Sequence, residues 1–188
     1  MKKIYIVTTF TGTLLSCLIR NISKTPYAHV SIALNEYLRP MYSFGRLNPK
    51  TPIFAGFVEE NINEGLYAIR TNTMCRVYSL MVTERQYEKL KENIDNVSIN
   101  RKQYVYDVKA LVYLSVNKPR KKDYKYVCSH FVADMLKRSE INILDKEPHQ
   151  VRPNDFYDLC DLELEYEGLL YNYYEKDKVH NIGDVVKI

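Results

Sequence analysis

The sequence has no tryptophan, no CxxC cysteine pair, and no apolar run near the ~20 residues of a membrane-spanning helix. Stable membrane insertion is therefore not expected. Four cysteines lie far apart in the chain: Cys17, Cys75, Cys128 and Cys160. This spacing suits free thiols in a reducing compartment better than a disulfide framework. Residues 1–10 also lack the small-residue cleavage site of a signal peptide, so we expect a cytoplasmic protein.

The sequence also lacks a large excess of either positive or negative charge. The chain has 27 lysines and arginines against 23 aspartates and glutamates, for a net charge of +4. Nucleic-acid-binding proteins usually concentrate a basic face, so no nucleic-acid partner is expected. The densest basic stretch, KPRKKDYK at residues 118–125, is interpreted first as a solvated connector. A phosphate- or membrane-contacting patch is the second interpretation.

Apolar residues are plentiful and make up 46% of the 188 residues. This predicts one globular domain over residues 1–188, large enough to bury a core. The 17 tyrosines are interpreted as packing their rings against that core with their hydroxyls outward, and a few of them as lining a groove.

Periodicity and turn residues predict an α+β fold, an antiparallel sheet packed against helices. Strands are expected over residues 3–9, 25–35, 41–46, 57–62, 74–82 and 163–174. Helices are expected over residues 12–23, 83–94 and 128–141, and a helix start near Pro153. Residues 104–116 favour a helix with a strand as the alternative, and two prolines and a glycine favour a surface loop over residues 47–57. Thr83 and Gln86 form a capping-box pattern at the start of the second helix.

The stretch YVCSHFVADML, at residues 126–136, raises the main functional question: what Cys128 does. A zinc site with His130 would need four ligands in recognisable pairs, and the sequence shows no second pair, so no metal is expected. A buried apolar cysteine is one interpretation. A nucleophile is the other, because Cys128 stands at the first turn of a helix, where free N–H groups and the helix dipole stabilise a thiolate.

A nucleophilic cysteine needs a base. His130, two positions along the same helix, points away from Cys128. His29 begins the stretch HVSIAL, whose alternation places His29 and Ser31 on the face of the strand opposite Val30. Taken alone, His29 reads as an ordinary strand histidine.

TPYAHVSIAL followed about a hundred residues later by YVCSHFVADML resembles the circularly permuted branch of the NlpC-type, papain-like cysteine hydrolases. This branch includes YiiX-like proteins and is akin to lecithin:retinol acyltransferase. Its pattern is a histidine opening a strand and, later, a helix that begins with the cysteine. The order of the two motifs here is that of the permuted form, and the resemblance spans residues 3–170.

The resemblance implies that Cys128 is the nucleophile and His29 the general base. A polar residue on the following strand then orients the imidazole; Ser43 fills this place, with Tyr42 as the register-shifted alternative. Tyr126 and Ser129 are the candidates for contact with substrate or oxyanion, with core packing and helix capping as their structural alternatives. Residues 46–57 are expected to border the groove or else to be a plain connector.

The expected activity is that of a thiol hydrolase acting through an acyl-enzyme without a cofactor. A peptide or amide substrate ranks first and a lipid-like acyl ester second. The alternatives are an acyltransferase of the same fold, a non-catalytic peptide- or lipid-binding module, and an interaction protein in which the two motifs are accidental.

Overall fold

The computed structural model describes residues 1–12, 26–48, 51–115, 118–157 and 159–173. The main strands are β1 (Lys2–Phe10), β2 (His29–Ala33), β3 (Met41–Asn48), β4 (Thr51–Glu60), β5 (Met74–Val82) and β8 (Glu163–Leu169). Two short strands are β6 (Val105–Tyr106) and β7 (Lys125–Tyr126). The helices are α2 (Gly65–Ile69), α3 (Glu84–Ile99), α4 (Val108–Ser115) and α5 (Cys128–Arg138), with 3-10 turns η1 (Arg101–Gln103), η2 (Pro148–Gln150) and η3 (Pro153–Phe156).

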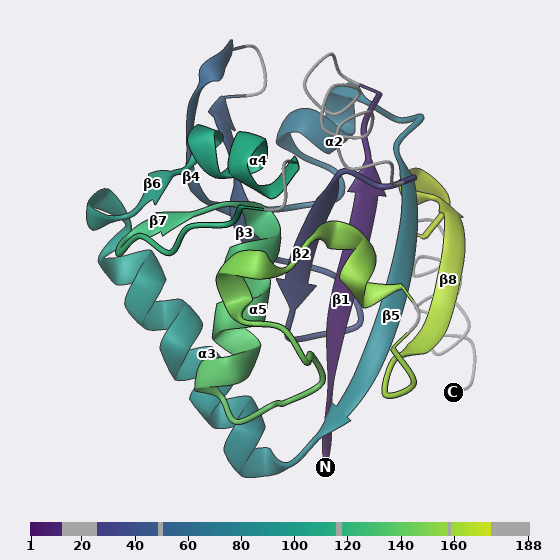
Figure 1. Cartoon of the computed structure of the whole chain (residues 1–188). Helices are drawn as coiled ribbons and strands as arrows, with labels where there is room; N and C mark the ends of the chain where they lie inside the picture. The colour runs from purple at the N-terminus through teal and green to yellow at the C-terminus, as the bar shows by residue number, and fades with distance from the viewer. Residues whose placement is uncertain (13–25, 49–50, 116–117, 158, 174–188) are drawn as a thin grey trace, which may run out of the picture.

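The main strands form one six-stranded antiparallel sheet in the order β4-β3-β2-β1-β5-β8 (Figure 1). β6 and β7 pair separately and in parallel. The expected α+β class with an antiparallel sheet is confirmed. The helix expected over residues 12–23 lies, apart from Gly12, outside the described residues, as do Cys17, His180 and the chain after residue 173.

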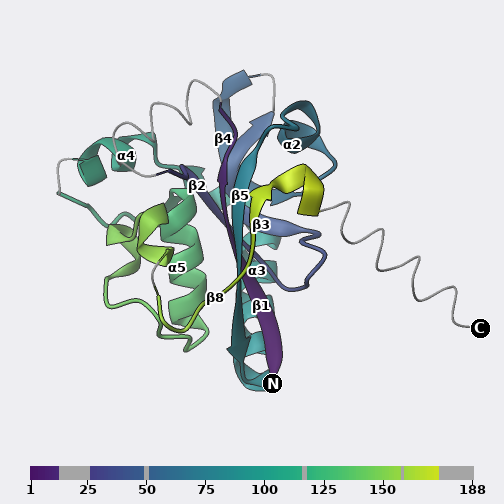
Figure 2. The same cartoon turned by 90° about the vertical axis from the view of Figure 1, so that its right-hand side faces the viewer.

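Helices α5 and α3 cover one face of the sheet, and Figure 2 shows α5 against the sheet seen edge-on. The face predicted for α5 is buried: Phe131, Val132, Met135 and Leu136. β1 contributes to both faces, since Ile4 and Ile6 pack under the helices, whereas Tyr5 and Val7 join a second cluster on the far side. Burying a large apolar side chain stabilises the fold by about 1.5–3 kcal/mol, so this alternation determines the register of the sheet.

Local signals place α3 and α5 correctly. Thr83 and Gln86 form the predicted capping box, with the Gln86 N–H 3.2 Å from Thr83 Oγ1. Both interpretations of residues 104–116 hold in part, because β6 is followed directly by α4. The last strand ends at Leu169, earlier than expected, and a short helical turn follows over residues 170–173.

The expected surface loop over residues 47–57 is wrong. This stretch completes a β-hairpin in which Gly45 pairs with Gly56 and Arg46 with Ala55. Its prolines and glycine suggested a loop, but β4 is the edge of the sheet, where a proline need not remove a ladder hydrogen bond. No helix in the described part of the chain is long and apolar enough to cross a bilayer.

Candidate active site

Cys128 is the first residue of α5 and is 4% exposed. No side chain caps this helix end, where the N-cap residue is Val127. At this end of the helix, the Phe131 N–H donates a backbone hydrogen bond to the Val127 carbonyl at 3.0 Å. The N–H groups of the first turn have no intrahelical acceptor, so donors gather beside the thiol.

His29 reaches this thiol from the start of β2. Its backbone pairs with Thr9 of β1, but the β2–β3 ladder is confined to Ile32–Tyr42 and Ala33–Met41. His29 therefore lies beyond the paired part of β2 and β3, at the end of the sheet near α5. The Cys128 thiol lies close enough to the imidazole to raise the pKa of His29. The two residues of the expected pair are thus brought together by the fold.

The other side of the imidazole contacts Glu60, the last residue of β4. His29 Nε2 lies 3.0 Å from Glu60 Oε1 and 3.2 Å from Oε2. Because Glu60 takes Nε2, Nδ1 is the ring nitrogen left for the thiol. Sequence reasoning missed Glu60 because it considered only the strand that follows His29, whereas the carboxylate comes from one strand further on.

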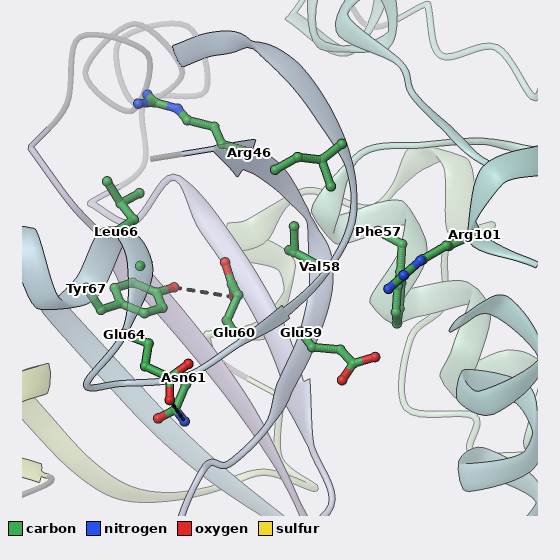
Figure 3. Close-up of a pocket in the computed structure, with 12 residues that line it drawn as sticks. Arg46, Phe57, Val58, Glu59, Glu60, Asn61, Glu64, Leu66, Tyr67 and Arg101 are labelled. Atoms are coloured by element: carbon green, nitrogen blue, oxygen red, sulfur yellow. Dashed lines mark hydrogen bonds between the residues drawn. The ribbon is translucent and has the colours of Figure 1, made fainter. Parts of the chain in front are cut away.

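Two hydroxyls hold the carboxylate in turn. Ser31 Oγ donates to Glu60 Oε2 at 2.6 Å, and the Tyr67 hydroxyl lies 3.4 Å from the same oxygen. Figure 3 shows the Tyr67 hydroxyl pointing at Glu60. The Tyr67 hydroxyl also lies 3.3 Å from Thr9 Oγ1. A carboxylate with this many partners has little freedom to leave the imidazole.

Burial and charge shift the pKa values of this group in the sense that favours an ion pair. Burial disfavours the charged ring, but the Glu60 carboxylate and the Cys128 thiol outweigh it and hold the pKa of His29 well above 6.5. Burial likewise acts against ionised Glu60, but the charge of His29 and hydrogen bonds from His29 and Ser31 hold the pKa of Glu60 below 4.5. Burial and the nearby carboxylate raise the pKa of Tyr67 well above 10, so its hydroxyl stays protonated.

Ser43 does not contact the imidazole in the role expected of it. It is fully buried, and its hydroxyl donates to the Val30 carbonyl at 2.7 Å. Since the β2–β3 ladder has ended there, the hydroxyl replaces a backbone donor. Tyr42, the alternative, stacks on Phe57 with ring centroids 6.3 Å apart, in the cluster under the helices. The position expected for either side chain is taken by Glu60.

Tyr126 and Ser129 have structural partners rather than an open place beside the thiol. The Tyr126 hydroxyl donates to Asp134 and accepts from Arg138 at 3.0 Å. Ser129 is the second residue of α5, not its N-cap, and its hydroxyl donates to the Val151 carbonyl at 2.6 Å. Their contacts therefore support packing for Tyr126 and anchoring of the helix for Ser129.

Tyr106 is a neighbour of the thiol that the sequence did not reveal. Burial first, and then the charge of Cys128, raise the pKa of Tyr106, while Arg46 acts in the opposite sense. Its hydroxyl is therefore protonated at neutral pH and is a second potential donor near Cys128. The only signal in the sequence was the strand alternative for residues 104–116, which places Tyr106 beside Tyr126.

His130 is unsuited to act as a base at neutral pH. Its ring lies against Tyr126 at a centroid distance of 4.5 Å, and burial lowers its pKa to about 4. His149 is its neighbour at a centroid distance of 6.4 Å. Within the described residues there is no group of three or more side chains able to hold a metal ion.

A cavity of about 410 Å³ opens on the Glu60 side of this group. Its apolar lining includes Phe57, Val58, Leu66 and Tyr67, while Arg46 and Arg101 lie at its margins (Figure 3). Glu60 lines it, but Cys128 and His29 do not. The hairpin thus borders the site from the side of the carboxylate.

No protein-family model matches this chain, and no curated protein matches it in sequence.

Proposed function

We propose that this chain is a thiol hydrolase of the circularly permuted, NlpC-type papain-like class, with Cys128 as nucleophile, His29 as general base and Glu60 as the residue that orients the base. The observation that carries the proposal is an imidazole held 3.0 Å from a buried carboxylate, with the Cys128 thiol near enough to raise its pKa. A structural cysteine needs neither an uncapped helix end nor a base held in this way.

In the reaction, the thiol proton moves to the neutral form of His29 and gives the imidazolium that its raised pKa favours, and Cys128 Sγ, now a thiolate, attacks the carbonyl carbon of the substrate. The oxyanion accepts hydrogen bonds from the first-turn N–H groups of α5. His29 then returns the proton to the leaving amine or alcohol, the bond to that group breaks, and an acyl-thioester remains on Cys128. Water, deprotonated by His29, attacks the thioester, which releases the acid and restores the thiol.

The role of Glu60 follows from charge. When His29 carries both protons, its positive charge faces a carboxylate at 3.0 Å, and so the imidazolium is stabilised at the moment it forms. A hydroxyl in this place would have stabilised the imidazolium less. The carboxylate therefore favours catalysis over the non-catalytic binding module. We place peptide or amide substrates first and acyl esters second.

The proposal is tested by acylation with an activated 4-nitrophenyl ester, followed by mass spectrometry of the proteolysed protein. We expect a burst of nitrophenol and an acyl group on the peptide that contains Cys128. Cys160 is exposed and serves as an internal control, since an ordinary thiol there is more accessible than one at Cys128. Cys128→Ala should abolish the burst, and His29→Ala should slow it roughly 10²–10⁴-fold.

A wild-type protein in which Cys160 acylates faster than Cys128 would contradict the proposal. So would a Cys128 rate that is unchanged by His29→Ala. Circular dichroism of both variants shows whether the fold is retained.

A further inference from the structure

The basic segment of the chain lies next to the site but has no part in the proposed reaction. Residues 101–125 hold eight lysines and arginines against two aspartates, a net charge of +6 in a chain whose total is +4. In the described part of the chain, no carboxylate forms an ion pair with any of these eight cations. Their charge therefore stays available to an external partner.

Exposed apolar side chains project from the same segment. Val105 is 52% exposed, Val108 is 62% exposed and Tyr124 is 56% exposed. Val105 and Tyr124 are adjacent, because the Val105 N–H donates to the Tyr124 carbonyl at 2.8 Å. Lys125 is the ladder partner of Val105, and Lys121 and Lys122 precede it in the chain. These six residues are called the basic patch below.

The backbone of Tyr124 gives an independent indication. Its φ is +58°, in the left-handed region that a bulky side chain rarely adopts. Glycine or asparagine would fit this turn with less strain. Its ring contacts Tyr104 edge-on at a centroid distance of 5.5 Å, yet more than half of the residue remains exposed. A strained aromatic residue that is more than half exposed points to a role in binding.

The patch adjoins the nucleophile. Figure 1 shows β6, β7 and α4 grouped at the N-terminal end of α5, where Cys128 lies. The same two strands also pair Tyr106 with Tyr126. Tyr126 is buried, and Tyr106 is near the thiol. A partner on the patch would therefore lie close to the end of α5 that carries Cys128.

We propose that the basic patch docks the protein on the surface of a membrane that contains anionic lipid. Lysines attract the negative headgroups, while Tyr124, Val105 and Val108 enter the boundary between headgroups and acyl chains. Protein interfaces are depleted in lysine, and aliphatic side chains neither stack on bases nor bind phosphates. The combination of lysines with a few outward apolar groups therefore fits a lipid surface better than a protein or a nucleic acid. The inference does not depend on the proposed reaction.

The test is co-sedimentation of the full chain with phosphatidylcholine vesicles that contain either no phosphatidylserine or about 30% of it. We expect binding only to the anionic vesicles, weakening as salt is raised. Lys122→Glu and Lys125→Glu should each lower the partition coefficient at least about fivefold. Lys91→Glu, on an exposed face of α3, makes the same change in total charge and should have much less effect.

Tyr124→Asn separates lipid insertion from a structural role, because asparagine tolerates the left-handed backbone. We expect this variant to keep the melting temperature and to lose vesicle binding. Tyr37→Asn, which removes another exposed tyrosine, should change neither.

Four results would overturn the inference: no binding to anionic vesicles, equal loss in Lys91→Glu and Lys122→Glu, unchanged binding in a folded Tyr124→Asn variant, or tighter binding to duplex DNA than to vesicles at the same salt. The last would indicate a nucleic-acid surface instead.

Discussion

His29 and Glu60 meet at 3.0 Å although their strands are not neighbours in the sheet. β3 lies between β2 and β4, and the Glu60 side chain reaches across it on the face opposite α5. Ser31, on the same face of β2 as His29, holds the far oxygen of the carboxylate at 2.6 Å. The orientation of the imidazole therefore depends on the register of three strands.

The first prediction concerns the charge of Glu60. Glu60→Gln keeps the size of the side chain but removes the negative charge, so the pKa of His29 should fall from its raised position toward 6.5. The Hε1 signal of His29, followed by NMR against pH, measures this directly. Acylation of Cys128 should slow roughly 10²–10⁴-fold.

Glu59→Gln is the matched control for this change. Glu59 points to the other side of β4 (Figure 3) and accepts a hydrogen bond from Ser98 at 3.0 Å. The His29 titration should be unaffected by it. Equal shifts in the two variants would mean that general charge, rather than contact, sets the pKa of His29.

The second prediction concerns stability and pH. The pKa of His29 is raised in the folded state. Its contribution to the free energy of unfolding is therefore complete below pH 6.5 and is lost as pH rises through the folded-state pKa. The pKa of Glu60 is lowered in the folded state. Its contribution to the free energy of unfolding is therefore complete above pH 4.5 and is lost as pH falls through the folded-state pKa. The coupling free energy between the two residues should therefore be largest between pH 4.5 and 6.5.

A double-mutant cycle with His29→Ala and Glu60→Gln, in urea unfolding at several pH values, measures this coupling. A coupling that keeps growing above neutral pH would show that the pair does not depend on a protonated ring.

The third prediction distinguishes the roles of two serines, Ser31 and Ser43, on the same face of the sheet. Ser31→Ala removes the donor to Glu60 Oε2, so the pKa of Glu60 should rise and the His29 titration should shift. Ser43→Ala removes the donor to the Val30 carbonyl and should cost about 1–3 kcal/mol of unfolding free energy without moving the titration of His29. A His29 shift in Ser43→Ala and none in Ser31→Ala would reverse the assignment made from the contacts.

Part of the fold and of the candidate site could be predicted from the sequence. The elements α3, α5, β1 and β5 follow from capping, periodicity and alternation, which are local signals. The places of Cys128 at a helix start and His29 at a strand start follow from the same signals. Their contact was expected from the resemblance of two short motifs to a known arrangement, since no local pattern encodes a distance across a hundred residues.

Glu60 could not be found in this way, because its place depends on tertiary register. In the sequence it is the second of two adjacent glutamates that follow a stretch with two prolines and a glycine. Its approach to His29 requires that residues 46–57 form a hairpin and that β2 and β3 are unpaired before Ile32, on the His29 side. Without that register, the next strand offered Ser43 as the nearest polar residue.

The last prediction tests how closely the β3–β4 hairpin fixes the position of the His29 ring. A Cβ at Gly45 would lie 3.5 Å from His29 Cε1 and 3.4 Å from Val58 Cγ2. These are contact distances, so Gly45→Ala should fold and leave the His29 titration nearly unchanged. Gly45→Val adds two methyl groups where the ring already touches, and should displace it from Glu60 or Cys128. Misplacement of a catalytic group by about 1 Å costs roughly 10² in rate, so we expect a fall of that order in Cys128 acylation.

Gly56→Val is the control, because Gly56 is the ladder partner of Gly45 on the same hairpin. The three atoms nearest to a Cβ there all belong to the flexible side chain of Leu47, the first at 3.6 Å. If the two valine variants lose acylation equally, the damage lies in the hairpin as a whole. If Gly45→Val alone loses it, with the melting temperatures alike, the hairpin acts on the reaction through the His29 ring.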